Sequence, residues 1–214
     1  MKQTFRHVIF DLGSVLIEVS DCATAPGFFE KFAEPKEKVL GFFNQGRGQA
    51  VVDMDAGKIN FAEFFELMKR ETGYRDSLAE FRKDYCDWFR LELKRDVFDI
   101  ILAIKRARLN VDLAILSNIN ELHWEYIGQK WPGLYANFWK RFASYQLKMI
   151  KPDPAIYRHV GKEIGAFAPN VCLFIDDREE NCVGARNVGM TAYCFDNADN
   201  LRTFLENTFE IKLV

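Results

Sequence analysis

The sequence lacks an excess of charge of either sign, a long apolar run and any CxxC pair. Its 29 basic and 31 acidic residues leave a net charge of −2, which argues against binding to nucleic acid or to an anionic membrane. No apolar run approaches the roughly 18 residues that a membrane helix needs, and the stretch before Asp11 has no signal-peptide pattern. Five cysteines without close pairing predict reduced thiols. These absences predict a cytoplasmic globular protein that binds neither nucleic acid nor membrane.

The 214 residues, 49% of them apolar, are enough for one domain with a modest insertion. Short apolar runs that each indicate a strand lie at 7–12, 111–116 and 171–175, with a weaker one at 191–195. Helical patterns over 120–130 and 179–188 follow the second and third runs. Apolar strands that alternate with helices predict an α/β fold with a doubly wound, Rossmann-like parallel sheet covered on both faces.

The segment between the first strand and residue 95 contains no comparable strand pattern. Phenylalanines at helical spacing follow Asn60, which is a suitable N-cap with Glu63 three residues later, and Gly73 ends this helix. We therefore expect a helical cap over 17–94, inserted into a catalytic core formed by 1–16 and 95–214. An insertion directly after the first strand would lie over the edge of the sheet as a lid.

Polar side chains stand at the ends of the predicted strands. They are Asp11 after the first strand, Ser117 and Asn118 at the second, Asp176 and Asp177 at the third, and Lys151 in the loop before the third. Singly, most of them could be helix caps or solvated residues. Two adjacent carboxylates after a buried strand, however, need a cation or donors to compensate them. Because ligands of open parallel sheets bind beyond the carboxyl ends of the strands, these side chains predict one site.

In this order, the motifs resemble those of the haloacid dehalogenase-like hydrolase superfamily. The matching stretches are IFDLGSVLI, LAILSNIN, LKMIKPDPAIY and CLFIDDREENCVGARNVGM. The position of the insertion is similar to that of the subclass with a helical cap, and the longer motifs look like those of bacterial α-D-glucose-1-phosphate phosphatases. The resemblance implies a Mg²⁺-dependent phosphomonoesterase that acts on a small sugar phosphate through an aspartyl-phosphate intermediate. The oligomeric state stays open.

The resemblance also assigns roles to residues. Asp11 would be the nucleophile and, with the Gly13 main-chain carbonyl and Asp177, a ligand of Mg²⁺; Asp176 would bind the metal directly or through water. The groups that would hold the phosphate belong to Leu12, Ser117, Asn118 and Lys151, and Lys151 would also offset charge beside Asp11. Two further candidates come from their place in the sequence: Asn181, on the loop of the acidic pair, is expected to orient that pair, and Arg47, flanked by two glycines in the cap, is a candidate contact to the substrate.

One position departs from the pattern, because Gly13 stands where the resembled family has its general acid and base. A positioned acid or base contributes about 10²–10⁴ in rate. Three interpretations follow: a leaving group that needs little help, another side chain in this role, or a protein that only binds. The candidates for the second interpretation are Glu18, His123, Asp53 and Asp55. A 2-haloacid dehalogenase is a further alternative, against which the Asp176–Asp177 pair argues, since it favours a metal and phosphate.

Overall fold

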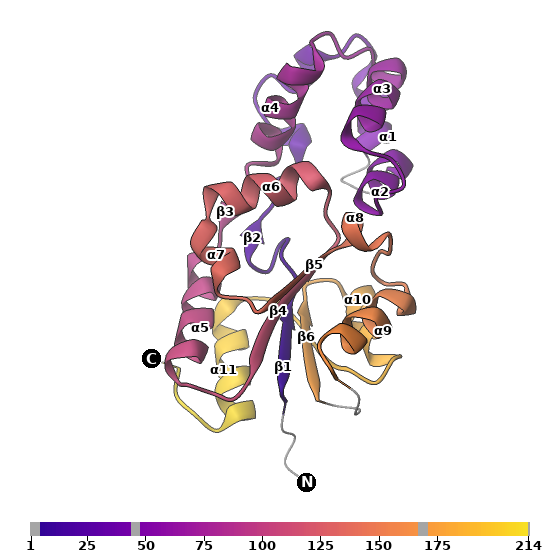
Figure 1. Cartoon of the computed structure of the whole chain (residues 1–214). Helices are drawn as coiled ribbons and strands as arrows, with labels where there is room; N and C mark the ends of the chain where they lie inside the picture. Colours follow the sequence, from indigo (N-terminus) through magenta and orange to yellow (C-terminus); the bar gives the residue numbers. More distant parts are fainter. Residues whose placement is uncertain (1–4, 44–47, 167–170, 214) are drawn as a thin grey trace.

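The computed structural model describes residues 5–43, 48–166 and 171–213 (Figure 1). A five-stranded sheet has the order β5–β4–β1–β6–β7, and every neighbouring pair is parallel. Its strands are β1 (His7–Phe10), β4 (Asp112–Ser117), β5 (Lys140–Ala143), β6 (Cys172–Asp176) and β7 (Thr191–Cys194). The predicted α/β parallel sheet is confirmed, and the four predicted strands are present with ends shifted by one or two residues.

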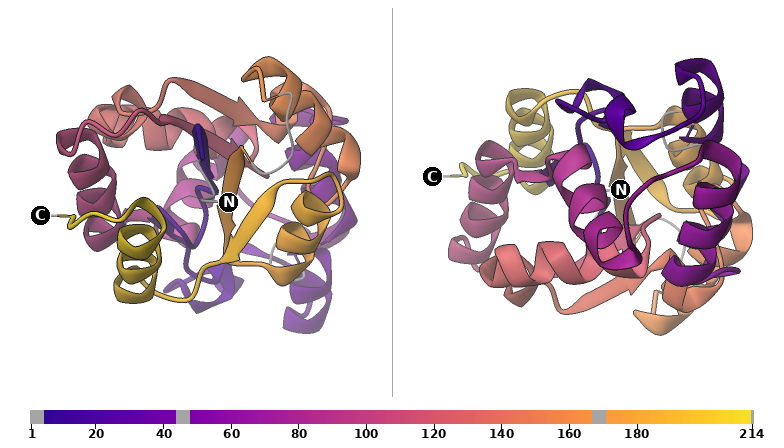
Figure 2. Two further views of the ribbon diagram at one scale, coloured as in Figure 1. Left: turned by 90° about the horizontal axis from the view of Figure 1, so that it is seen from below. Right: turned by 90° about the horizontal axis from the view of Figure 1, so that it is seen from above.

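Helices cover both faces of this sheet (Figure 2). Side chains alternate along β1, so that Val8 and Phe10 pack into one apolar cluster and Ile9 packs into another. The first cluster includes α5 (Arg95–Arg106) and α11 (Ala198–Phe209), and the second includes α9 (Pro154–Glu163) and α10 (Glu179–Arg186). All three β1 residues are fully buried, as expected for the central strand of a doubly wound sheet.

Strand β5 was not expected from the sequence, because its residues KRFA include two charges and form no apolar run. It lies at the edge of the sheet, where Lys140 and Arg141 keep contact with solvent. Three short helices surround this region, namely α6 (Glu121–Lys130), α7 (Pro132–Ala136) and α8 (Ser144–Leu147). Of these, the sequence predicted only α6.

Four helices form a separate layer above the carboxyl edge of the sheet (Figure 1). They are α1 (Lys36–Phe43), α2 (Gln49–Asp55), α3 (Phe61–Thr72) and α4 (Leu78–Phe89). The N-cap at Asn60 is confirmed, with reciprocal bonds to Glu63, and Gly73 ends α3 at φ 64°. Aromatic rings fill the space between these helices; Phe28 lies 4.7 Å from Trp88, centroid to centroid, in an edge-to-face arrangement.

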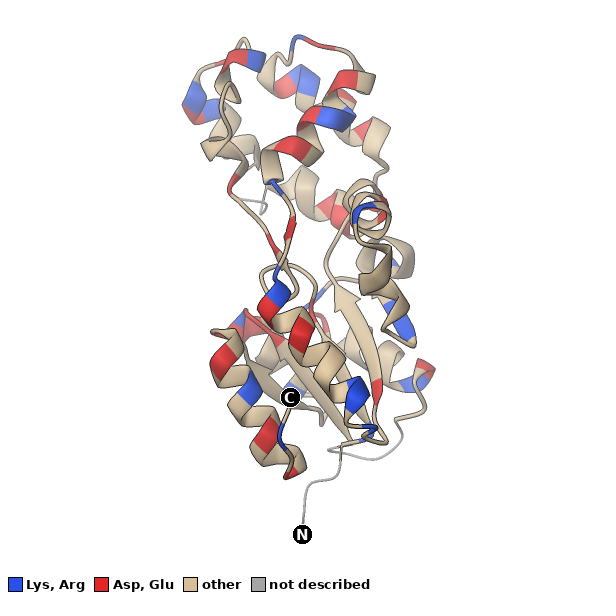
Figure 3. Cartoon of the chain, turned by 90° about the vertical axis from the view of Figure 1, so that its left-hand side faces the viewer, with Lys and Arg blue, Asp and Glu red and all other residues tan. Residues whose placement is uncertain are grey.

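A short antiparallel ribbon, β2 (Ile17–Glu18) with β3 (Glu92–Leu93), carries the chain between the sheet and these four helices (Figure 3). Glu18 stands opposite Glu92, and Lys130 offsets this repulsion with Nζ 2.7 Å from a Glu92 carboxylate oxygen. The ribbon lies at both boundaries of the expected cap over 17–94. Among the described residues, no helix combines the length and apolar character needed to cross a bilayer.

Candidate active site

Three parallel strands deliver the predicted polar residues to one edge. In the register of the sheet Phe10 is level with Ile115 and Ile175, so the chain segments that follow these residues emerge together. Asp11 follows β1, Ser117 ends β4 and Asp176 ends β6, and each of these side chains is buried. The sheet topology thus brings residues far apart in sequence into one cluster.

Lys151 lies at the centre of this cluster. Its Nζ is 2.9 Å from Asp11 Oδ1 and 2.6 Å from Asp176 Oδ2, and it donates to the Leu116 carbonyl at 3.1 Å. The ammonium is almost completely buried, so its charge is balanced by the two carboxylates rather than by solvent. Lys151 is therefore placed to hold Asp11 and Asp176 in position.

Asp176 is held from its other side as well. Its Oδ1 accepts from Asn181 Nδ2 at 2.8 Å and from the Arg178 backbone N–H at 3.0 Å. Tyr157 in turn donates its hydroxyl to the Asn181 carbonyl at 2.8 Å. With both carboxylate oxygens engaged, Asp176 is a fixed group, and Asn181 contacts this member of the acidic pair.

Three carboxylates offer a place for a cation. Oxygen atoms of Asp11, Asp176 and Asp177 lie within 4.8 Å of one another. Burial raises the pKa of Asp11 to about 7, against the opposing effect of Lys151, and burial also raises the pKa of Asp177. Hard oxygen ligands at this separation suit Mg²⁺, which neutralises crowded carboxylates. The residues present therefore fit a magnesium ion.

The loop after β1 and the end of β4 carry the other groups that we expect near a phosphate. The Leu12 backbone N–H donates to Asp11 Oδ1 at 2.6 Å, and this bond orients the carboxylate. Leu12, Gly13, Ser117 and Asn118 all line one cavity of about 180 Å³ between the sheet and the upper helices. Three of the expected phosphate-binding residues, Leu12, Ser117 and Asn118, are thus adjacent to a space that can hold a small molecule, and Lys151 is not part of its lining.

The far wall of this cavity is mostly apolar and comes from the upper helices and α6. Its polar members include Asp55 at the end of α2 and His123 in α6. The His123 ring stacks on Tyr85 at 4.7 Å, its Nε2 has no partner among the described residues, and burial lowers its pKa to about 4. His123 is therefore a neutral imidazole in the cavity wall, and its Nε2 is buried.

Two other candidates for the missing acid lie elsewhere. Glu18 is exposed on the ribbon, and Asp53 faces away from the cavity wall, where it pairs with Lys58 at 2.9 Å. Lys58 and Gln49 hydrogen bonds hold the pKa of Asp53 below its ordinary value. The candidate substrate contact Arg47 lies outside the described residues.

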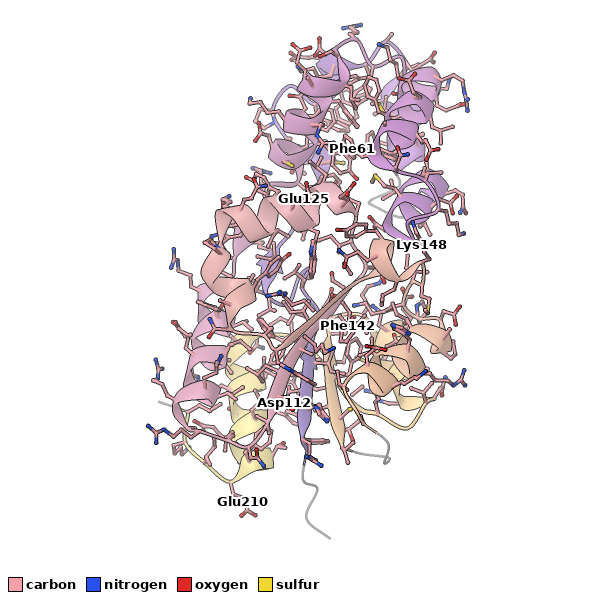
Figure 4. All side chains as sticks on the ribbon, viewed as in Figure 1. Phe61, Asp112, Glu125, Phe142, Lys148 and Glu210 are labelled. Atoms are coloured by element: carbon pink, nitrogen blue, oxygen red, sulfur yellow. The ribbon has the colours of Figure 1, made fainter. Side chains whose placement is uncertain are left out.

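Sequence reasoning missed the residues that join the upper helices to the sheet. Ser144 Oγ donates to the Asp55 carbonyl at 2.5 Å, and Asn120 Nδ2 donates to Asp55 Oδ1 at 3.1 Å. Lys148 donates to the Gly57 carbonyl from the end of α8, where it lies beside α2 (Figure 4). A polar residue in a loop gives no signal of such a distant partner, so only the N-cap role of Asn120 was predictable.

The chain belongs to the haloacid dehalogenase-like hydrolase family, which matches residues 5–189. It is 26% identical to drimenol cyclase DrtB of Aspergillus calidoustus over 95% of this chain, and 47% identical to flavin mononucleotide hydrolase 1 of Arabidopsis thaliana over 24% of it. The matched segments cover 36% of the first relative and 20% of the second. The chain therefore spans about a third of the length of drimenol cyclase DrtB.

Solved structures share the whole architecture. The HAD family enzyme BT-2542 of Bacteroides thetaiotaomicron, in complex with magnesium and inorganic phosphate, has a TM-score of 0.70 at 26% identity over 92% of this chain and 98% of that one. L-2-haloacid dehalogenase of Xanthobacter autotrophicus has a TM-score of 0.62 at 19% identity over 88% and 76% of the two chains. The second likeness shows the fold alone.

Proposed function

We propose that this protein is a Mg²⁺-dependent phosphomonoesterase that acts on a small sugar phosphate through a covalent intermediate on Asp11. The observation that carries the proposal is the cluster in which Lys151 lies between Asp11 and Asp176, with Asp177 beside them. Hydrolysis of phosphate monoesters needs a nucleophile and strong neutralisation of charge. The cluster offers both within one buried site.

Asp11 is the proposed nucleophile, since its carboxylate is oriented by Leu12 and held by Lys151. Attack on phosphorus and later hydrolysis of the aspartyl-phosphate divide one difficult step into two. Asp11, Asp176, Asp177 and the Gly13 carbonyl would hold Mg²⁺, which supplies charge neutralisation for the phosphate oxygens when bound.

The phosphate itself would be held by groups at the ends of β1 and β4 and by Lys151. The proposed contacts are the Leu12 main chain, the Ser117 hydroxyl, the Asn118 backbone N–H and the Lys151 ammonium. Hydrogen bonds from such fixed donors are strongest where charge develops, in a site that water does not fill. This division of roles leaves the cavity wall free to contact the leaving group.

The magnesium and phosphate complex of BT-2542 and the name of the Arabidopsis flavin mononucleotide hydrolase support phosphate chemistry for this chain. A sugar as the leaving group is supported by the polar residues of the cavity wall, Asp55, Asn120 and neutral His123, whose side chains can form hydrogen bonds with hydroxyl groups. Glucose 1-phosphate is the member of this substrate class to be tested first.

A second candidate function is a binding or regulatory role without turnover, and Gly13 is the observation that favours it. The third, a 2-haloacid dehalogenase, has its support in the fold of the Xanthobacter enzyme. The Asp176–Asp177 pair argues against the dehalogenase, because two adjacent carboxylates favour a bound metal ion and dehalogenation needs none.

The test is phosphate release from p-nitrophenyl phosphate, glucose 1-phosphate and glucose 6-phosphate, with Mg²⁺ and with EDTA. We expect release with Mg²⁺ only, and none from folded Asp11→Asn. Absence of release from every compound by the folded wild type would favour the binding role. Chloride release from 2-chloropropionate in EDTA would favour the dehalogenase.

A further inference from the structure

The site described so far has no group that can protonate a leaving oxygen. Gly13 has no side chain, and Lys151 is engaged with Asp11 and Asp176. An alkoxide leaves poorly from phosphorus unless an acid supplies a proton in the transition state. An acid in this role must therefore come from another residue near Gly13, on the side of the cavity away from the metal cluster.

Among the described residues that line the cavity with Gly13 and Ser117, Asp55 is the one that carries a carboxyl group. It ends α2, half-buried between the upper helices and α6. Neither of the other acidic candidates, Glu18 and Asp53, lines this cavity. Asp55 thus belongs to the upper helices in sequence and to the active-site cavity in space.

Two core residues fix Asp55. Ser144 Oγ donates to its main-chain carbonyl at 2.5 Å, and Asn120 Nδ2 donates to Oδ1 at 3.1 Å. The Asn120 amide cannot turn without loss, because its Oδ1 accepts from the His123 backbone N–H at 3.0 Å. Within the described part of the chain the Asp55 carboxylate has no other hydrogen-bond partner, so its second oxygen is available to a ligand.

We propose that Asp55 is the catalytic acid and base of this site, supplied by α2 in place of a side chain at position 13. This inference rests on the phosphomonoesterase proposed above. As Asp11 bonds to phosphorus, the bond from phosphorus to the leaving oxygen breaks, and that oxygen keeps the electron pair and takes the Asp55 proton. In the second step a water oxygen bonds to phosphorus, the Asp11–phosphorus bond breaks, and the Asp55 carboxylate takes a proton from the water.

The surroundings of Asp55 suit this role. Burial raises the pKa of Asp55 to about 7, against the opposing effect of the Asn120 hydrogen bond, so both protonation states are accessible near neutral pH. The titratable groups around it are Tyr85 of α4, whose pKa burial raises well above its ordinary value, neutral His123 of α6, and Lys148, which contacts Gly57. None of these forms an ion pair with Asp55 among the described contacts.

The test compares a substrate that needs an acid with one that does not. Glucose 6-phosphate leaves as an alkoxide, whereas p-nitrophenyl phosphate leaves as a stabilised phenolate. We expect Asp55→Asn to lower kcat/KM for glucose 6-phosphate by at least about a hundredfold and to change kcat/KM for p-nitrophenyl phosphate by less than about threefold, because kcat/KM reports the steps up to departure of the leaving group and not the later attack of water. Asp53→Asn, on the same helix, is the matched control and should change neither.

Equal losses on both substrates, or no loss on either, would overturn the role of Asp55. A second measurement needs no variant: in the wild type, the ratio of kcat/KM for glucose 6-phosphate to kcat/KM for p-nitrophenyl phosphate should fall as pH rises through about 7, since groups common to both reactions cancel. A flat ratio would also overturn the proposal. Release of p-nitrophenolate by the wild type separates this failure from failure of the proposed function, because departure of this leaving group depends on Asp11 and needs no proton from Asp55.

Discussion

Asn118 binds both main-chain polar groups of Lys151: its Oδ1 accepts from the Lys151 N–H at 2.8 Å, and its Nδ2 donates to the Lys151 carbonyl at 2.9 Å. This pair of bonds joins the loop after β4 to the loop before α9. It sets the backbone from which the Lys151 ammonium reaches Asp11 and Asp176. The side chain of Asn118 therefore positions the Lys151 ammonium, and this role is separate from the phosphate contact proposed for the Asn118 backbone N–H.

Asn118→Ala should lower the free energy of unfolding by about 1–3 kcal/mol, because two partly buried main-chain groups lose their partners. The variant should therefore unfold at a lower denaturant concentration. Turnover should fall as well, since Lys151 loses its fixed position. Urea unfolding and phosphate release measure the two effects. Asn137→Ala, which removes an exposed bond to Gly133 far from the site, is the control. Unchanged stability and turnover in Asn118→Ala would contradict this account.

Lys151→Met should lower the free energy of unfolding by about 3–5 kcal/mol, because two buried carboxylates lose their shared counter-ion. We expect Mg²⁺ to recover more stability in this variant than in the wild type, since it would compensate the same carboxylates. Urea unfolding with Mg²⁺ and with EDTA measures the difference. A variant as stable as the wild type in EDTA would show that Lys151 does not balance this charge.

Lys148 combines a strained backbone with a contact to the upper helices. Its φ of 57° favours glycine, while its ammonium donates to the Gly57 carbonyl. Lys148→Gly and Lys148→Ala both lose the contact, but only the first relieves the strain. We expect Lys148→Gly to be the more stable of the two by about 1 kcal/mol. Thermal unfolding of the pair checks this, and the reverse order would contradict it.

Asp55 should also make folding depend on pH. Its pKa is raised to about 7 in the folded protein, mainly by burial, and the ordinary value is 3.8. The folded state therefore binds the proton more tightly, and the stabilisation is lost as pH rises from about 4 through 7. The free energy of unfolding of the wild type, relative to that of Asp55→Asn, should be lower at pH 8 than at pH 5. A difference independent of pH would contradict the raised pKa.

Local patterns were enough to predict much of the fold. Apolar runs ending at Asp11, Ser117 and Asp176 identify central strands, because a strand buried on both faces needs a continuous apolar sequence. The parallel arrangement then places their ends together, so the gathering of these side chains with Lys151 could be expected. The same reasoning predicted the helix between Asn60 and Gly73 from its caps.

The rest depends on contacts between distant segments. Strand β5 has no apolar run, because an edge strand keeps charged residues toward solvent. Asp55 and Asp53 are indistinguishable in sequence, two residues apart in one helix. Their environments diverge because Asn120 and Ser144, from the far side of the cavity, contact only Asp55. Helical spacing places Asp55 on the same side of α2 as Val51, but no local pattern identifies Asn120 and Ser144 as its partners.

The most direct test of the central claim is detection of the covalent intermediate. Enzyme mixed with Mg²⁺ and p-nitrophenyl phosphate is quenched in acid within one turnover, digested, and its peptides are weighed by mass spectrometry. We predict that the peptide containing Asp11 gains the mass of one phosphoryl group and that the same peptide of Asp11→Asn gains none. Turnover without phosphoryl transfer to this peptide, or undiminished turnover by Asp11→Asn, would contradict the account.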